Sequence, residues 1–208
     1  MITIIDYGLG NTQAFLNIYK KLHIPAQTAK SESDLEGASK LILPGVGHFD
    51  YAMQRFNDSG MRGKVESLVL QNNVPVLGVC VGMQIMANSS EEGVESGLGW
   101  IGGTVKSLES IVKIDNNLPL PHMGWSSVTP NHKDLFNNID SGDLEFYFLH
   151  SYYFNCTSQE NCIADADYGL NFCCAINNNN IFGVQFHPEK SHHSGVNLLK
   201  NFAELEVC

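Results

Sequence analysis

Residues 77–86 read LGVCVGMQIM and place a cysteine at the end of an apolar run. The run Val74–Val79 has the length and composition of a buried strand, and a helix-forming stretch follows Cys80. Gly78 and Gly82 flank the cysteine at equal spacing. Small neighbours on both sides of a nucleophile are typical of the tight strand-to-helix turn called a nucleophile elbow. Cysteine is also among the most buried residue types, so a thiol packed in the core is the alternative interpretation at this point.

Strands and helices alternate on the N-terminal side of this turn. Apolar strands are expected at 2–6 and 40–47 and in the run that ends on Cys80, and helices are expected at 12–22 and 61–73. Such alternation predicts a parallel sheet with helices on both faces.

The second half of the chain is mostly strand-like. The stretch NNNN at 177–180 is expected to join two strands as a hairpin turn, and an amphipathic helix is expected at 195–205. We therefore predict an α/β fold, a three-layer sandwich around a mostly parallel sheet with an added antiparallel portion. No linker or internal repeat interrupts the pattern, so residues 1–208 are expected to form a single domain.

Charge and composition exclude several classes of partner. The chain of 208 residues has a formal net charge of -10, and such an acidic surface does not attract nucleic acid or anionic membranes. No run approaches the ~20 apolar residues of a membrane span, and the first residues read as a strand and a turn rather than as a signal peptide. The six cysteines lack C-x-x-C spacing, so we expect reduced thiols and a cytoplasmic protein.

Three unusual strand ends are predicted to meet in space. They are PGVG at 44–47, Cys80, and HPEKS at 187–191. In an open α/β sheet, ligands gather at the carboxyl ends of the strands, so these three segments can converge on one edge. Taken alone, PGVG would be an ordinary turn and HPEKS a surface turn. Their conjunction with Cys80 favours a functional site.

A catalytic triad is the chemistry that these strand ends allow. On an extended strand end, the side chains of His187 and Glu189 would point the same way, so the carboxylate could hold the imidazole in one tautomer. With Cys80 as nucleophile, this gives a nucleophile, a base and an orienting group. The helix expected after Cys80 would favour the deprotonated sulfur, and the backbone N–H of Val81 would point at a developing oxyanion. The glycines of PGVG could turn a further N–H toward it.

These motifs, taken with others along the chain, resemble class I glutamine amidotransferases. The matching stretches are collinear and cover nearly the whole chain, and their combination is highly specific. They are LPGVGHF, LGVCVGMQIM, SSEEG, GLGW, PHMGW, FYFLHSYYF and GVQFHPEKS.

The resemblance implies a substrate and a role for each site residue. Glutamine would be hydrolysed to glutamate and ammonia through a thioester on Cys80, with His187 as base and then acid and with Glu189 orienting it. The N–H of Val81 and a backbone N–H of the turn at Val46 and Gly47 would form the oxyanion hole. The residues that would hold glutamine are Gln84, Glu92, Ser151, Tyr152 and Ser191.

The resemblance also implies a partner. It is strongest with glutaminase subunits that pass ammonia to a separate (β/α)8-barrel synthase subunit in a heterodimer, above all for imidazole glycerol phosphate formation in histidine biosynthesis. Trp125, Tyr147 and Lys190 match family positions at that interface. One peptide rotation in the PGVG turn would complete the oxyanion hole when the partner binds. No cofactor is implied. No metal site is expected either, because the adjacent His192 and His193 point apart and lack a third ligand.

Departures from the family pattern leave the pathway open at this stage. Ser126 follows Trp125 where family members usually carry asparagine. The pair at 192–193 and the HSYY stretch also resemble a paralogous group, which feeds ammonia to an enzyme that forms an acetamidino group on a surface sugar.

Two further classes of function remain as alternatives. A cysteine peptidase or γ-glutamyl hydrolase on the same fold would keep Cys80 and His187, but it would leave Gln84 with Glu92 unexplained. A binding subunit with a dead site would need no triad, whereas all three triad residues are present.

Overall fold

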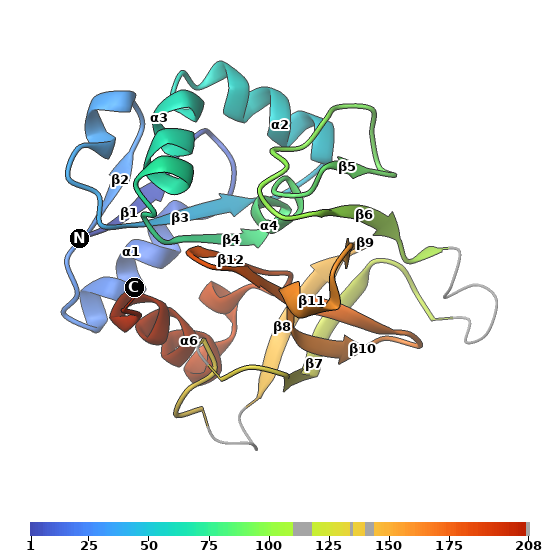
Figure 1. The fold of residues 1–208 in the computed structure, drawn as a ribbon. Helices are drawn as coiled ribbons and strands as arrows, with labels where there is room; N and C mark the ends of the chain where they lie inside the picture. Colours follow the sequence, from blue (N-terminus) through green and yellow to red (C-terminus); the bar gives the residue numbers. More distant parts are fainter. Residues whose placement is uncertain (110–117, 134, 140–143, 207–208) are drawn as a thin grey trace.

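The computed structural model describes residues 1–109, 118–133, 135–139 and 144–206. Its centre is a nine-stranded sheet with the strand order β2-β1-β3-β4-β12-β11-β10-β7-β8 (Figure 1). The strands of this sheet are β1 (Ile2–Ile5), β2 (Ala26–Ala29), β3 (Lys40–Gly45), β4 (Val76–Cys80), β7 (His122–Pro130), β8 (Glu145–His150), β10 (Cys162–Asp167), β11 (Asn171–Asn178) and β12 (Ile181–Val184).

The described sheet joins a parallel half to an antiparallel half. Strands β2, β1, β3, β4 and β12 pair in parallel. From β12 through β11, β10 and β7 to β8, every pairing is antiparallel. A three-stranded sheet of β5 (Ser89–Ser90), β6 (Gly103–Ser107) and β9 (Tyr152–Cys156) lies beside them. The predicted α/β sandwich with an added antiparallel portion is confirmed.

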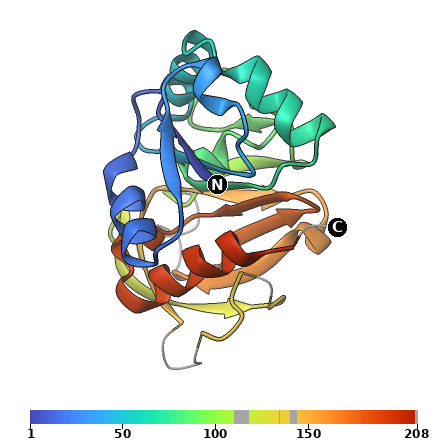
Figure 2. The same cartoon turned by 90° about the vertical axis from the view of Figure 1, so that its left-hand side faces the viewer.

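Helices cover both faces of the parallel half (Figure 1). Helices α2 and α3 lie on one side and α1 and α6 on the other, and Figure 2 shows the same division from a second direction. The Tyr19 hydroxyl of α1 donates to the Leu199 carbonyl of α6 at 3.2 Å, which ties that second layer together. No helix in the described ranges is long and apolar enough to cross a membrane. The helices are α1 (Thr12–Lys21), α2 (Phe49–Asp58), α3 (Arg62–Glu66), α4 (Val81–Gln84) and α6 (His192–Glu204), with short helical turns η1 (Glu32–Leu35), η2 (Ser67–Gln71), η4 (Gln159–Asn161) and η5 (Pro188–Lys190).

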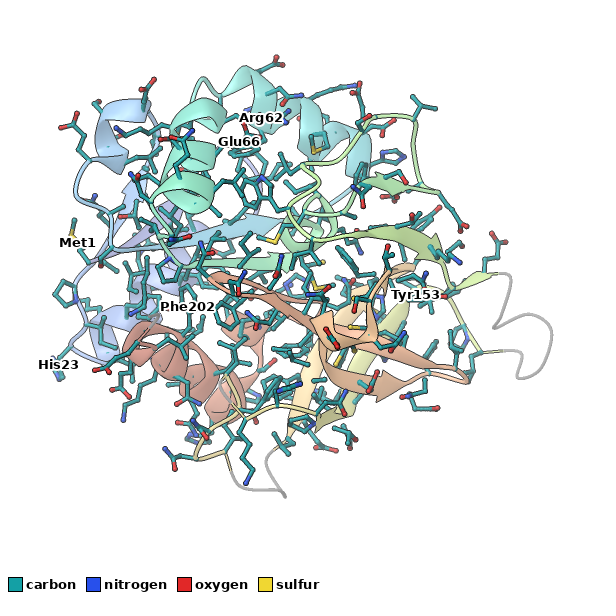
Figure 3. The ribbon with its side chains drawn as sticks, viewed as in Figure 1. Met1, His23, Arg62, Glu66, Tyr153 and Phe202 are labelled. Carbon is teal, nitrogen blue, oxygen red and sulfur yellow. The ribbon has the colours of Figure 1, made fainter. Side chains whose placement is uncertain are left out.

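The closing helix shows how the pattern of apolar residues becomes packing. Leu198, Leu199 and Phe202 recur at helical spacing on α6, and all three are fully buried. The ring of Phe202, labelled in Figure 3, meets Phe182 of β12 with 6.3 Å between ring centroids, so α6 is held against the centre of the sheet. Burying a side chain of this size contributes roughly 1.5–3 kcal/mol. The helix therefore fixes β12, which leads directly into the HPEKS segment.

Some elements differ from the expectations. The predicted helix at 61–73 is α3 followed by the π-helical turn η2, and the helix after Cys80 is the single turn α4. Helix α2 was not predicted, although its buried residues recur at helical spacing. The hairpin at 177–180 is confirmed, since β11 ends at Asn178 and β12 begins at Ile181. The buried residues of α2 are Phe49, Ala52, Met53 and Phe56.

Candidate active site

Cys80 occupies a strained turn between β4 and α4. Its φ of 56° and ψ of -116° lie where non-glycine residues are rarely found, and such strain is typical of a nucleophile elbow. The flanking glycines are explained by close approach. A Cβ on Gly82 would collide with the carbonyl oxygen of Leu43 on β3, and one on Gly78 would lie 2.7 Å from the carbonyl oxygen of Gly82. Larger residues would push the elbow away from the sheet.

The helix that follows the cysteine is shorter than predicted. Because α4 is a single turn, Val81–Gln84, its summed dipole is small. The dipole of a long helix therefore does not act on the Cys80 sulfur to favour its deprotonated form. That part of the prediction is wrong. Val81 still lines the same cavity as Cys80, so its N–H stays a candidate for binding an oxyanion.

His187 and Glu189 are in direct contact. The distance from His187 Nδ1 to Glu189 Oε1 is 2.8 Å, and both side chains are buried. The pair is not formed on an extended strand, as the sequence had suggested. Pro188 begins the 3-10 turn η5, and this turn folds the carboxylate back onto the imidazole. The second carboxylate oxygen, Oε2, is buried without a hydrogen-bond partner among the described residues.

The environment of His187 stabilises its charged form. Burial lowers the pKa of His187, but hydrogen bonds to Cys80 and Glu189, together with the charges of both, outweigh burial and raise that pKa to about 9. The imidazole is therefore hydrogen-bonded to the carboxylate and lines the same cavity as the cysteine. This is the arrangement of nucleophile, base and orienting group.

The three predicted strand ends meet at one cavity. Strands β3, β4 and β12 are neighbours in the sheet, and Gly45 pairs with Cys80 in the β3–β4 register. The cavity has a volume of about 290 Å³, near the lower end of the roughly 300–1,000 Å³ usual for small-molecule sites. Ten of the residues predicted from the sequence line it. They are Val46, Gly47, Cys80, Val81, Gln84, Glu92, Ser151, Tyr152, His187 and Lys190.

Hydrogen bonds hold the polar lining of the cavity in place. Gln84 Nε2 donates to the Tyr152 carbonyl at 3.0 Å. Glu92 Oε2 accepts from the Phe49 backbone N–H at 2.8 Å, so this carboxylate caps the start of α2 while it lines the cavity. The cavity thus offers an amide and a carboxylate held by backbone contacts.

Ser191 is placed differently from its predicted role. The sequence suggested that it contacts substrate, but its fully buried hydroxyl donates to the His187 carbonyl at 2.6 Å and accepts from the Tyr147 N–H at 3.0 Å. It is not among the residues that line the cavity. Its contacts instead join the HPEKS segment to β8, because η5 turns the side chain inward.

Sequence comparison establishes the family of the chain. The sequence pattern described as "Glutamine amidotransferase class-I" matches residues 3–205. The chain belongs to the class I glutamine amidotransferase family.

Full-length relatives carry a more specific name. The chain is 55% identical over 206 residues to the imidazole glycerol phosphate synthase subunit HisH of Bdellovibrio bacteriovorus, covering 99% of this chain and 100% of that protein. It is 52% identical to the protein of the same name from Leptospira interrogans, with the same coverage. Among solved structures, PurLQS from Thermotoga maritima contains a chain that superimposes with a TM-score of 0.69 at 15% identity, covering 97% of this chain and 96% of that one. This last likeness supports the fold alone.

The predicted interface residues of this amidotransferase form an aromatic cluster beside the cavity. Trp125 and Tyr147 are paired across β7 and β8, with 6.1 Å between ring centroids. Lys190 Nζ lies 5.7 Å from the Tyr147 ring centroid, and His192 stacks on Trp125 at 5.1 Å. Trp125 remains 45% exposed. The three predicted residues therefore lie together, and His192 joins them.

Sequence reasoning missed two polar residues of the amidotransferase site. Gln185 is fully buried, and its amide nitrogen donates to Cys80 Sγ at 3.7 Å. His150 lines the cavity and is 5% exposed. A signal for Gln185 was present, because it lies two residues before His187 and alternation along a strand places such residues on one side.

Proposed function

We propose that this chain is the glutaminase subunit of an imidazole glycerol phosphate synthase in cytoplasmic histidine biosynthesis. It hydrolyses glutamine and passes ammonia to a (β/α)8-barrel synthase subunit of the HisF type, with which it forms a heterodimer. Residues 1–208 act as one amidotransferase domain. The observation that carries the proposal is a buried Cys80–His187–Glu189 constellation at a cavity, in a chain 55% identical to a HisH protein over its whole length.

The first half of the reaction forms a thioester. The Cys80 sulfur attacks the side-chain amide carbon of glutamine as a thiolate, with the proton of its thiol held on His187. The tetrahedral intermediate collapses when the carbon–nitrogen bond breaks, and His187 gives the proton to the leaving nitrogen, which departs as ammonia. Glu189 holds the imidazole by its Nδ1 throughout, at the 2.8 Å distance that the structure provides.

The second half of the reaction releases glutamate. Water attacks the thioester carbon while His187 removes a water proton, and the same proton returns to the sulfur as it leaves. In both halves, negative charge develops on the carbonyl oxygen. The N–H of Val81 and an N–H from the turn at Val46 and Gly47, both at the cavity, stabilise that charge.

The cavity suits a free amino acid with an amide side chain. Glu92 supplies a negative charge for the substrate ammonium group, which a peptide bond would lack. Gln84, Ser151 and Tyr152 supply hydrogen-bonding groups in the same cavity. This polar set favours glutamine over the peptide substrates of a cysteine peptidase.

An exposed apolar surface beside the cavity supports a protein partner. Met123 and Leu149 are paired across β7 and β8, as are Trp125 and Tyr147 two residues further along. Met123 is 65% exposed and Leu149 is 37% exposed. Apolar side chains gathered in this way mark an interaction surface. Because Leu149 and Val46 also line the cavity, a partner bound here covers its mouth.

Glutamate release is the first measurement. We expect slow release by the chain alone and strong stimulation by the imidazole glycerol phosphate synthase barrel with its nucleotide ligand. Stimulation only by the sugar-modifying barrel would place the chain in the paralogous group. No stimulation by either barrel would contradict the proposed pathway.

Labelling of Cys80 separates an amidotransferase from the other classes. A glutamine-like electrophile is expected to label Cys80 in preference to the other thiols, and excess glutamine is expected to protect it. A peptidase would show no glutamine protection, and a dead binding subunit would show no preference for Cys80. One of the other five thiols, Cys208, lies outside the described residues.

The Gly47 turn offers a test of the oxyanion hole. Gly47 has a φ of 93°, and a Cβ at this position would meet no heavy atom within 4 Å. A β-branched residue is therefore opposed by backbone conformation and not by crowding. We expect Gly47→Val to abolish partner-stimulated turnover while the fold is kept. Undiminished turnover would remove this turn from the mechanism.

A further inference from the structure

A chain of buried hydrogen bonds runs across β7 and β8 toward the active site. Ser126 Oγ lies 2.8 Å from His122 Nε2, and His122 Nδ1 lies 2.9 Å from His150 Nε2. His150 Nδ1 then lies 2.9 Å from the Tyr152 carbonyl oxygen. His122 and His150 are 2% and 5% exposed. The triad described above uses none of these three side chains.

The carbonyl at the end of this chain fixes the direction of every bond. A carbonyl oxygen can only accept, so His150 donates from Nδ1. Burial lowers the pKa of His150 to about 3, so the ring is neutral and its Nε2 is an acceptor. His122 must then donate from Nδ1. Burial also lowers the pKa of His122 to about 4, so its Nε2 accepts the hydroxyl proton of Ser126.

The same carbonyl connects the chain to the site. The Tyr152 oxygen also accepts from Gln84 Nε2 at 3.0 Å, and that nitrogen donates its second hydrogen to Gln185 Oε1 at 3.0 Å. With the Gln185 amide oriented in this way, its Nε2 donates to Cys80 Sγ at 3.7 Å. One continuous set of contacts therefore leads from Ser126 to the sulfur.

Aromatic rings hold the middle of the chain. The His122 ring lies between Phe148 and Tyr168, with centroid distances of 4.8 Å and 4.0 Å and nearly parallel planes. The Tyr168 hydroxyl donates to the Pro119 carbonyl at 2.7 Å. Stacking on both faces opposes rotation of the ring about its Cβ–Cγ bond, so the two nitrogens of His122 stay directed at His150 and Ser126.

We propose that Ser126, His122 and His150 are positioning residues that fix the Tyr152 carbonyl and, through it, the Gln84 amide at the substrate cavity. This inference rests on the proposed glutaminase function. The three residues do not touch the reacting atoms. They set two tautomers and one carbonyl orientation before glutamine binds, and so remove conformations in which Gln84 is turned away from the cavity.

Nitrogen NMR of the resting chain tests the tautomers directly. Protonated and bare imidazole nitrogens have different ¹⁵N shifts, so a neutral ring reports which nitrogen carries hydrogen. We expect both His122 and His150 to be protonated at Nδ1 and bare at Nε2, with no averaging between tautomers. A His150 protonated at Nε2 would overturn the proposal, and so would ¹⁵N shifts of the two rings that are averaged between tautomers.

Kinetics of matched variants test the positioning role. His122→Phe keeps a ring between Phe148 and Tyr168 but removes both nitrogens. We expect it to raise the KM for glutamine about tenfold in the complex with the barrel subunit, with kcat lowered less than about threefold, because the hydrogen bonds of His122 to Ser126 and His150 are both lost. Ser126→Ala is expected to raise KM by about threefold, and Ser126→Thr, which keeps the hydroxyl, to restore it.

Controls separate the possible failures. Ser127→Ala removes a hydroxyl from the next, exposed residue of β7, and we expect its KM to be unchanged. Alkylation of Cys80 by iodoacetamide and the thermal midpoint check that His122→Phe remains folded. An unchanged KM in folded His122→Phe would overturn the positioning role while the glutaminase function stands. A wild-type complex that does not hydrolyse glutamine would instead overturn the proposed function. The role of the Ser126–His122–His150 hydrogen bonds in glutamine binding would fall with it.

Discussion

Two buried histidine sites in this protein are shifted in opposite directions. At the start of η5, beyond β12, His187 is 2% exposed and its pKa is raised to about 9. Across β7 and β8, His122 and His150 are 2% and 5% exposed, and burial lowers their pKa values to about 4 and 3. Equal burial therefore coexists with a charged ring in one place and two neutral rings in the other.

The neighbours of each ring account for the difference. Burial lowers the pKa at both sites, because it disfavours the charged imidazolium. At His187, Glu189 at 2.8 Å and the Cys80 side chain favour the charged ring. Among the described residues, the rings of His122 and His150 contact each other, a hydroxyl, a carbonyl and aromatic rings, and the charge of His187 further lowers the pKa of His150. The Glu189 carboxylate thus makes one site suitable for moving protons. At the other site, the described hydrogen-bond partners of the two rings are uncharged, which leaves fixed neutral tautomers suitable for positioning.

Removing the carboxylate should produce the largest change. Glu189→Gln keeps the shape of the side chain but removes its charge. We expect glutamine hydrolysis by the complex to fall by about 10²–10⁴-fold, because His187 loses its orienting acceptor and part of the stabilisation of its charged form. The pKa of His187, followed by NMR, should fall from about 9.

A surface carboxylate serves as the control for this substitution. Glu160 lies in the exposed turn η4, outside the triad and the cavity lining, and Glu160→Gln makes the same chemical change there. We expect full activity from it. If Glu189→Gln were equally active, the carboxylate could not be the feature that distinguishes the two histidine sites.

Stability should depend on pH with opposite signs at the two sites. Folding raises the pKa of His187 from its ordinary 6.5, so its contribution is fully present below about pH 6.5 and is lost as pH rises through about 9. This contribution amounts to roughly 3 kcal/mol at most. Folding lowers the pKa of His122 and His150, so stability falls as pH drops from about 6.5 toward 4 and 3.

Urea unfolding between pH 5 and pH 9.5 measures the pH dependence of stability on both the acid and the alkaline side. We expect the free energy of unfolding to decline on each side of a maximum near neutral pH. Glu189→Gln should flatten the alkaline decline, and His122→Phe should flatten the acid decline. If these two variants left the acid and alkaline declines unchanged, the histidines would not control the pH dependence of stability.

The sequence was informative where a property depends on neighbouring residues. The elbow could be predicted because an apolar run, Cys80 and two flanking glycines are adjacent in the chain. The His187–Glu189 contact could be predicted from spacing, although the reason given was wrong, because Pro188 turns the backbone into η5. The length of α4 could not be predicted, since tertiary packing and not propensity ends this helix after one turn.

Contacts between distant residues could not be predicted in the same way. Gln185 meets Gln84, which is 101 positions away, and only the pairing of β4 with β12 brings the two amides together. Ser191 carries no local sign that its hydroxyl turns inward to the His187 carbonyl. The His122–His150 pair likewise depends on the β7–β8 register, in which these two residues are direct partners.

The smallest expected effect comes from giving the neutral site a charge of its own. Ser126→Asp places a carboxylate near His122 Nε2, where the serine hydroxyl lies at 2.8 Å. A neighbouring carboxylate favours the imidazolium, so the pKa of His122 should rise from about 4 by about one unit or more in an NMR titration. Ser127→Asp, with the same charge on the next, exposed residue, should shift it much less. A His122 that stayed near 4 beside a carboxylate would mean that burial dominates this site whatever its partners are, and the contrast with His187 would then need a cause other than Glu189.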